Sequence, residues 1–360
     1  MTLVWIVLGA LAAWVAAGVV GSFFPRDLAR SPYPSPGEAC AAMDALAGAH
    51  PGRCRVEEIG RSREGRTIRA YRLCVGDPAG RPRLLVTAQI HAVEFIGSYV
   101  ARRVARDLLE GHGRDPEATA LLDAAEVVIV PLLNPDGAER IWRAKGRTRL
   151  GPARFTAGGV DPNRNFPFLP VEGKAAWNSG RNRPGSAYYR GPHPLSEPEC
   201  LALARFARRE RFCAAVNFHS FGCVVYLPEV PDRDREKAQR ALDAFHGPFQ
   251  SRQTRPYKPV PERSAAIVGQ LDPFLLHGLG APSVTIEVSR PGWHLLHPRS
   301  AFHVFSIANP PDPERWAAND AGATIHALGE LLARTGGTPC EPAKPELAEQ
   351  VPGAEGGGGA

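Results

Sequence analysis

The chain has 360 residues, of which 44% are hydrophobic and 22% charged, the balance of an ordinary globular protein with a sizeable core. Its formal net charge of +6 comes from lysines and arginines that are spread along the chain rather than gathered in a basic block. This distribution favours a solvated arginine-rich surface and argues against nucleic-acid binding. The seven cysteines include no CxxC pair, which argues against a cysteine-based metal site.

An uncharged apolar segment, residues 3–24, opens the sequence. About 20 apolar residues are enough to cross a bilayer as a helix. A cleavable signal peptide carries a basic stretch before its apolar core, and none precedes Leu3. We therefore expect residues 1–24 to form an uncleaved membrane anchor, with a signal segment as the alternative. Residues 25–36 are rich in Pro and Ser and are expected to be a linker.

The middle of the chain alternates strand-like and helix-like segments. Short β-branched and apolar runs predict buried strands at 83–87, 127–133, 214–218 and 283–288, and helical spacing predicts helices at 95–109 and 198–210. This alternation predicts an α/β fold, with a mixed, mostly parallel twisted sheet between helices and function at the loops beyond the strand ends. We expect one catalytic domain over 37–334 and a disordered Pro-, Glu-, Gly- and Ala-rich tail over 335–360.

Ionisable side chains follow these predicted strands. His91 and Glu94 come shortly after the first strand, His219 directly follows the third, and Glu287 lies inside the fourth. A buried carboxylate needs a partner. Catalytic zinc is commonly held by three ligands of the His/His/Glu set, with water as the fourth, and a nearby carboxylate can take the proton of that water. Each residue alone also fits a structural role, so the order of the surrounding motifs has to decide.

Those motifs resemble the carboxypeptidase A-type zinc carboxypeptidases over about residues 37–330. In chain order they are Glu57–Arg66 (EEIGRSREGR), His91-Ala-Val-Glu94, Asn134-Pro-Asp-Gly137, Gly159–Phe166 (GVDPNRNF), Tyr189-Arg-Gly191 with Pro194–Glu199 (PLSEPE), His219-Ser220 and Thr285-Ile-Glu287. The resemblance implies one Zn²⁺ held by His91, Glu94 and His219. It makes Glu287 the general base, which deprotonates the zinc-bound water and then protonates the leaving amine.

The resemblance also implies roles for residues around the metal. Asp161 is expected to orient His91, as a partner of a metal-bound imidazole usually does. Asn163 and Arg164 are expected to grip the terminal carboxylate of the substrate, a task that suits the planar guanidinium. Arg143, in Ile-Trp-Arg, is expected to polarise the scissile carbonyl, although it lies closer to Asn134 than in the digestive enzymes.

Two departures from the family pattern concern the substrate. Val93 stands between the two close ligands, where digestive members carry a peptide-binding arginine, and Ser264 falls where a substrate-binding tyrosine is expected. Tyr257 is a candidate replacement from the same loop. The late histidines His294, His297 and His303 are expected to be loop residues rather than a second metal site.

We therefore interpret the chain as a zinc-dependent hydrolase that removes C-terminal amino acids from peptides. The alternative is a γ-D-glutamyl-diaminopimelate amidase acting on cell-wall muropeptides, with which the two departures are compatible. An acyl-amino-acid deacylase and a membrane-tethered binding module fit the motifs less well. This chemistry places the catalytic domain outside the cytoplasm, periplasmic or extracellular, attached to the membrane through residues 3–24 or secreted if they are cleaved.

Overall fold

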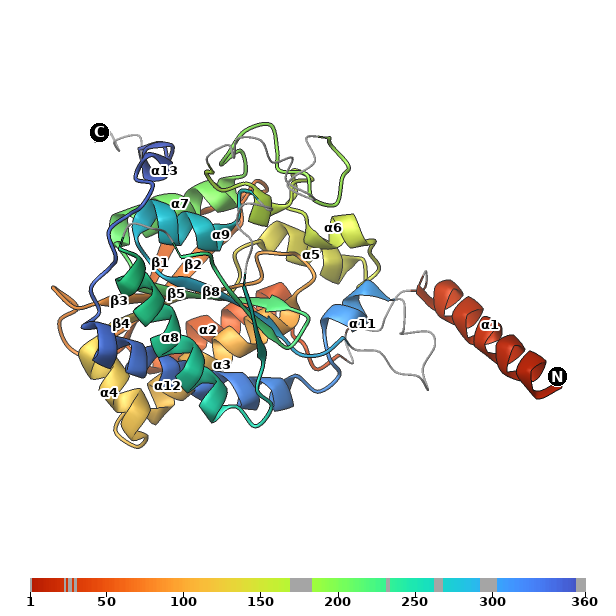
Figure 1. Cartoon of the computed structure of the whole chain (residues 1–360), viewed down its shortest axis with the longest axis horizontal. Coiled ribbons are helices and arrows are strands. Elements are labelled where there is room, and N and C mark those ends of the chain that lie inside the picture. The colour runs from red at the N-terminus through yellow and green to blue at the C-terminus, as the bar shows by residue number, and fades with distance from the viewer. Residues whose placement is uncertain are drawn as a thin grey trace.

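The computed structural model of the protein describes residues 2–22, 24, 28, 31–168, 183–230, 234–261, 268–291 and 303–353. In these residues a sheet of eight strands has the order β1-β2-β4-β3-β5-β8-β6-β7, with helices on both sides (Figure 1). The strands are β1 (Cys54–Arg61), β2 (Thr67–Leu73), β3 (Arg83–Ala88), β4 (Glu126–Val130), β5 (Ala214–Ser220), β6 (Val224–Leu227), β7 (Lys258–Pro261) and β8 (Ser283–Val288). The predicted mixed, mostly parallel α/β sheet is confirmed.

Four parallel strands, β4, β3, β5 and β8, form the middle of the sheet. Their side chains alternate between two apolar cores, as a two-residue period requires. Leu84 and Val86 belong to one core, whereas Leu85 belongs to the other. Both faces are covered, which explains why these strands appear in the sequence as continuous apolar runs.

Helices cover the two faces of the sheet. The larger core packs against α2 (Pro36–Ala49), α3 (Phe95–Gly111), α4 (Pro116–Ala124), α8 (Arg235–Arg252) and α12 (Pro313–Thr335), and the smaller one against α7 (Pro198–Glu210), α9 (Leu271–Pro273) and the π-helical turn η4 (Phe274–Gly278). Short helices α5 (Pro135–Arg143), α6 (Leu150–Arg154), η2 (Pro162–Arg164) and α11 (Val304–Ala308) follow within the loops. The helices predicted at 95–109 and 198–210 correspond to α3 and α7.

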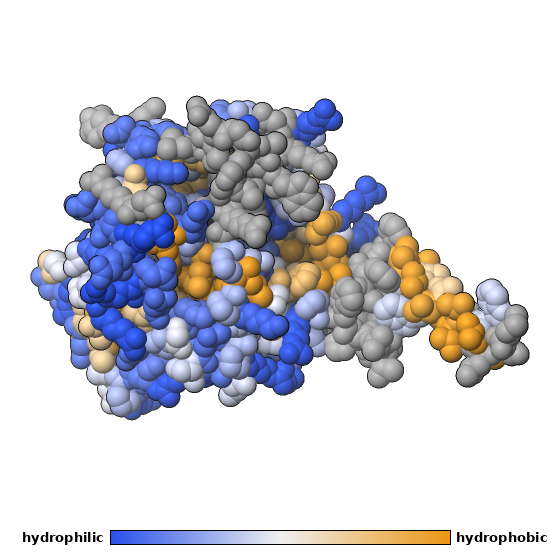
Figure 2. All heavy atoms as spheres, in the orientation of Figure 1, coloured by the Kyte–Doolittle hydropathy of each residue, from blue (hydrophilic) through white to orange (hydrophobic). Residues whose placement is uncertain are grey.

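The N-terminal helix α1 (Thr2–Ser22) is apolar and exposed. Its window Val4–Gly21 has the length and composition to cross a membrane, and only 11% of it is buried. Figure 2 shows the contrast between this apolar helix and the mostly hydrophilic face of the rest of the molecule. Length and composition fit both the expected anchor and the expected signal segment.

The segments that flank the domain are more ordered than their composition suggests. Leu28 and Tyr33, in the expected linker, are buried, and the Tyr33 hydroxyl donates a hydrogen bond of 2.8 Å to the carbonyl of Pro310. After α12, the chain buries Leu347 and Val351 and forms the short helix α13 (Glu346–Glu349). Residues 336–353 therefore depart from the disordered tail expected from residue 335, because a few apolar side chains dock them on η4 and α7. Residues 354–360 lie outside the described part.

Candidate metal centre

The three candidate ligands and Glu287 come from neighbouring strands. β3 ends at Ala88, the loop after it carries His91, and Glu94 is the residue before α3. β5, the neighbour of β3, carries His219 near its carboxyl end, and β8 carries Glu287. In the parallel pairing of β5 with β8, His219 lies directly opposite Glu287. The sheet therefore brings residues far apart in the sequence to one edge, as parallel α/β sheets commonly do at a binding site.

The ligand atoms have the spacing of a metal site. His91 Nδ1 lies 2.8 Å from Glu94 Oε1 and 3.2 Å from His219 Nδ1, and His219 Nδ1 lies 3.1 Å from Glu94 Oε2. Tetrahedral zinc with bonds of about 2.0–2.1 Å holds its ligand atoms about 3.3 Å apart. Two imidazole nitrogens that face each other and a carboxylate, all buried, are the donor set that zinc prefers. The residues present thus fit a zinc ion.

The two glutamates of the site differ in their electrostatics. Burial acts to raise the pKa of Glu94, but His91 and His219 outweigh it and lower the pKa to about 2. Burial, with the charge of Glu94 adding to it, raises the pKa of Glu287 well above its ordinary value, against the pull of Arg154. Glu287 Oε2 is buried and accepts no hydrogen bond from any residue that the structure describes. A bound cation would oppose this rise and supply the missing counter-charge.

Asp161 lies behind His91. Its Oδ1 is 3.2 Å from His91 Nε2, and the Arg154 Nε donates to its Oδ2 at 3.0 Å. Burial acts to raise the pKa of Asp161, but Arg154, Arg164 and His91 lower it far below the ordinary value. Asp161 is therefore an ionised carboxylate that can accept the Nε2 proton of His91 and direct Nδ1 toward the metal position.

Two arginines compete for the role expected of Arg143. The side chain of Arg143 is 71% exposed at the end of α5 and pairs with Glu139 at 2.7 Å. Arg154, at the end of α6, is instead 2.8 Å from His91 Nε2 through Nη2 and acts on both Glu94 and Asp161. Arg154 belongs to no motif, and only its position seven residues before Asp161 connects it with the site in the sequence.

One more aromatic residue that the motifs missed lies beside the arginines. The ring of Tyr188 is 5.3 Å from the guanidinium carbon of Arg154 and 5.5 Å from that of Arg164, within the range of cation–π contact. Tyr188 immediately precedes the Tyr-Arg-Gly landmark, and that adjacency was the available signal.

Asn163 and Arg164 are buried in η2 and are held from behind by the loop before α9. Asn163 Oδ1 accepts the backbone N–H of Leu271 at 2.9 Å. Gly269, at a φ of +75°, packs so closely on the backbone of Arg164 that an added Cβ would lie 2.1 Å from its carbonyl oxygen. Only glycine fits this position, so the loop fixes where Arg164 lies.

Other landmarks of the sequence build the scaffold. Asn134 caps α5 and donates to the carbonyls of Ile90 and Phe155 at 3.1 and 3.2 Å, which ties the loop of His91 to the region of Arg154. The carboxylate of Asp136 accepts hydrogen bonds from the Ser62 hydroxyl and from the backbone N–H of Glu64, both in the Glu57–Arg66 motif. These contacts explain why several motifs carry no chemistry of their own.

The remaining expectations concern residues that the sequence placed near the substrate. Val93 is buried, and Tyr257 is buried with its hydroxyl bonded to Asp320, so Tyr257 acts in the core and does not replace the expected substrate-binding tyrosine. His303 is buried beside α11. Ser264, His294 and His297 lie outside the described residues. In the described part of the chain, His91, Glu94 and His219 are the only such cluster of metal-ligating groups.

Comparison with known proteins agrees with this site. A family model described as zinc carboxypeptidase matches residues 39–299. Carboxypeptidase A6 of Mus musculus is 31% identical over 218 residues, covering 55% of this chain and 48% of that protein. The chain thus spans about half the length of the curated relatives it matches.

Solved structures show the same fold at low sequence identity. Thrombin activatable fibrinolysis inhibitor has a TM-score of 0.66 at 19% identity, covering 84% of this chain and 74% of that one. Carboxypeptidase A from Helicoverpa armigera has a TM-score of 0.63 at 19% identity, covering 85% and 74%. With the family model matching most of the chain and the donor set in place, the chain belongs to the zinc carboxypeptidase family.

Proposed function

We propose that this protein hydrolyses the C-terminal peptide bond of peptides, with zinc held by His91, Glu94 and His219. The observation that carries the proposal is the parallel register that sets His219 opposite Glu287. In this register a candidate metal ligand and the carboxyl group of Glu287 lie side by side on adjacent strands. When bound, the zinc ion supplies a Lewis acid that polarises the carbonyl and lowers the pKa of water.

Glu287 then acts as the general base. Its raised pKa, and an Oε2 without a hydrogen-bond partner in the described part of the chain, make it a group that can accept a proton from water and return it to the leaving amine. Its strand neighbours hold it in place. Thr285, two residues earlier on the same face, donates to the buried carboxylate of Asp272, which also accepts from Ser283. These two hydrogen bonds tie β8 to the start of α9.

Arg154 is our candidate for the residue that holds the developing oxyanion, in preference to Arg143. A neutral imidazole has one donor and one acceptor nitrogen. When Nδ1 of His91 is a ligand, Nε2 carries the proton and donates to Asp161, so the Arg154 Nη2 loses its acceptor there. Its Nε stays on Asp161, and Nη2 is available to a substrate oxygen.

The two arginines test this assignment against each other. We expect Arg154→Gln to lower kcat about 10²–10³-fold, the usual effect of removing one oxyanion donor. Arg143→Gln, the matched control, removes an exposed ion pair and should change kcat little. Steady-state kinetics on one peptide decides; the reverse result would restore Arg143 to the role that the sequence suggested.

Asn163 and Arg164 are proposed to bind the terminal carboxylate of the substrate, since Arg164 is fixed by the Gly269 loop beside Arg154 and Tyr188. The amidase on muropeptides is the second candidate, favoured by the buried Val93 where digestive members carry an arginine. A substrate panel separates the two: peptides with a free C-terminus, the same peptides amidated, and muropeptides, each with and without a chelator.

We expect hydrolysis of free-ended peptides that a chelator abolishes and added zinc restores. Cleavage of muropeptides alone would establish the amidase. Hydrolysis that survives chelation would contradict both candidates.

We further propose that α1 is retained as a membrane anchor, with the catalytic domain outside the cytoplasm. The support is its apolar 18-residue window, exposed along its length. Resistance of the full chain to alkaline carbonate extraction is the expected result, and a shortened N-terminus in the mature protein would identify a signal segment instead.

A further inference from the structure

A cavity of about 210 Å³ lies between α2 and α3 and is lined by none of the residues of the metal centre. It is smaller than the roughly 300–1,000 Å³ of pockets for drug-sized ligands, so it suits a small group. Its wall consists of three apolar residues from α2 and four long side chains from α3: Ala42, Met43, Leu46, Tyr99, Arg102, Arg103 and Arg106.

The α3 side of this cavity is basic. Residues 99, 102, 103 and 106 are spaced i, i+3, i+4 and i+7, so they share one face of the helix. The opposite face of α3 is apolar and packs in the core, whereas this face is partly exposed. It carries one tyrosine and three arginines opposite Met43 and Leu46 of α2. Three positive charges are therefore gathered beside an apolar wall.

The three guanidinium groups are not equally neutralised. Arg103 pairs with Asp107 at 2.6 Å and also with Glu314, and Arg106 lies 3.9 and 4.0 Å from the same two carboxylates. Arg102 makes no hydrogen bond or ion pair anywhere in the described residues, and its Nε is buried. Burial lowers its pKa, and its guanidinium lies 5.2 Å over the Tyr99 ring. Three guanidinium groups on the cavity wall are thus matched by two carboxylates that lie outside its lining.

We propose that this cavity binds the phosphate of an anionic phospholipid, so that the domain docks on the membrane that holds α1. Arg102 and Arg106 bind the phosphate oxygens, and Met43 and Leu46 contact the apolar part of the lipid. An apolar wall beside an incompletely neutralised cation matches a phosphate carried on a hydrocarbon chain better than a free anion. The inference builds on α1 as an anchor and is independent of the hydrolytic activity.

The linker argues that this side of the domain faces the membrane. The ring of Tyr33 packs edge-on against Tyr99 of the cavity wall, with centroids 6.1 Å apart. Ten residues separate Tyr33 from Ser22, the end of α1, and the chain between the two residues reaches at most about 40 Å when fully extended. Basic side chains near a membrane anchor attract anionic lipids. The chain is therefore tied to its domain at the edge of the proposed lipid site.

The test uses the full chain in nanodiscs of phosphatidylcholine, with or without phosphatidylglycerol, and follows amide hydrogen exchange in α2 and α3. We expect phosphatidylglycerol to protect these helices in the native chain. The double variant Arg102→Gln with Arg106→Gln should lose that protection. Arg240→Gln with Arg334→Gln, which removes two exposed arginines elsewhere, should keep it. Titration with a short-chain phosphatidylglycerol in detergent should show roughly 30-fold weaker binding for the first pair.

Three results would overturn the proposal. Equal protection in both lipid mixtures would show that no anionic headgroup binds. A double variant that behaves like the native chain would place any lipid binding elsewhere. Equal protection by inorganic phosphate at the same concentration would reduce the cavity to a small-anion site. If carbonate extracts the chain, its binding to vesicles of the same two lipid compositions is measured by co-sedimentation. Equal binding to both compositions contradicts the proposal.

Discussion

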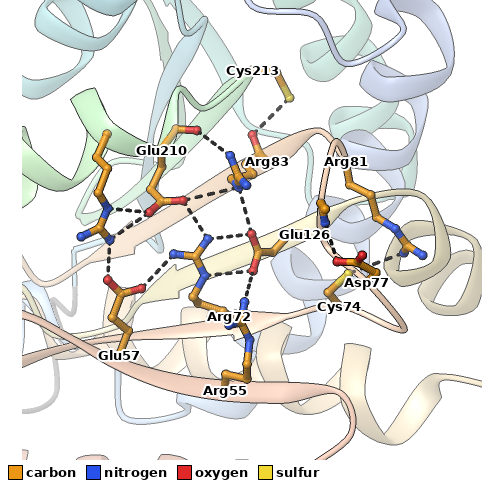
Figure 3. Close-up of polar contacts among 12 residues, drawn as sticks. Arg55, Glu57, Arg72, Cys74, Asp77, Arg81, Arg83, Glu126, Glu210 and Cys213 are labelled. Carbon is orange, nitrogen blue, oxygen red and sulfur yellow. Dashed lines mark hydrogen bonds and ion pairs between the residues drawn. The ribbon is translucent and has the colours of Figure 1, made fainter.

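The two ends of the parallel strands carry two buried clusters of charge that are built in different ways. At the amino ends, Glu126 starts β4, Arg83 starts β3 and Glu210 ends α7 just before β5. These residues form an ion-pair network with Arg72 at its centre, which contacts Glu126 and Glu210 at 2.7 Å each (Figure 3). At the carboxyl ends lie the candidate zinc ligands and Glu287.

The difference is in how well the charges are satisfied. Glu126 accepts hydrogen bonds from Arg55, Arg72 and Arg83, so both of its oxygens have partners. Among the described residues at the other end, Glu287 Oε2 is buried without a hydrogen-bond partner, and Glu94 Oε2 has the ion pair with His219 at 3.1 Å. A buried charge cluster whose groups are all hydrogen-bonded stabilises the fold, whereas buried charges without partners are typical of a binding site. The same strands therefore carry a stabilising ion-pair network at one end and the candidate metal site at the other.

The first prediction concerns the chemical end. Glu287→Gln should lower kcat about 10²–10⁴-fold, because the general base is lost. The zinc content of this variant should stay at one per chain, since the three ligands remain. Without zinc, the variant should be no less stable than the zinc-free native chain. Steady-state kinetics, metal analysis and urea unfolding measure these three. Retention of most activity would exclude Glu287 as the base.

The second prediction concerns the structural end. Glu126→Gln should lower the free energy of unfolding by about 3–5 kcal/mol, because Arg72 stays buried without its main partner. Zinc content and kcat at low temperature should be unchanged. Glu236→Gln is the control, an exposed pair on α8 whose loss should cost below about 1 kcal/mol. Equal effects of the two substitutions would remove the distinction between the two ends.

The third prediction tests the support behind the metal. Asp161→Asn should weaken zinc affinity about 10–100-fold, since the amide holds the His91 proton less strongly than a carboxylate. Competition with a fluorescent zinc chelator measures it. An unchanged affinity would mean that Asp161 serves Arg154 and Arg164 rather than His91.

The smallest effect is expected from Glu199, a buried carboxylate on α7 that belongs to neither cluster. Burial and the charges of Glu197 and Asp136 raise its pKa to about 7. The folded chain keeps this proton up to about pH 7, whereas the unfolded chain loses it near pH 4. Stability should therefore fall as pH rises from about 4 to 7. Glu199→Gln should flatten this fall by about 1 kcal/mol between pH 5.5 and 7 in urea unfolding; a parallel profile would contradict it.

The sequence was informative wherever a local pattern decides the structure. The apolar runs located β3, β4, β5 and β8, because strands buried on both faces leave a continuous signal. His91, Glu94 and His219 became candidate ligands through the order of the surrounding motifs, and the structure brings these three residues together. The strand signal is short-range, whereas the ligand signal needed motifs from most of the chain.

What the sequence could not supply depends on contacts between distant segments. The arginines appeared as a solvated surface, yet Arg72 is buried by glutamates from three other elements. Arg154 belongs to no motif. The packing of α6, which no local pattern reports, brings it to His91 and Asp161. The composition after residue 335 predicted disorder, because composition gives little weight to a few apolar side chains. Two of them, Leu347 and Val351, are buried against the domain.

The pairing of His219 with Glu287 has a consequence for how the protein loses function. Both residues lie on hydrogen-bonded strands in the middle of the sheet. Local openings that let loops and termini exchange with solvent leave such strands intact, and only global unfolding separates them. Separation of His219 from Glu287 should therefore coincide with loss of the whole fold, whereas an opening of the loop that carries His91 disturbs only the metal side of the site.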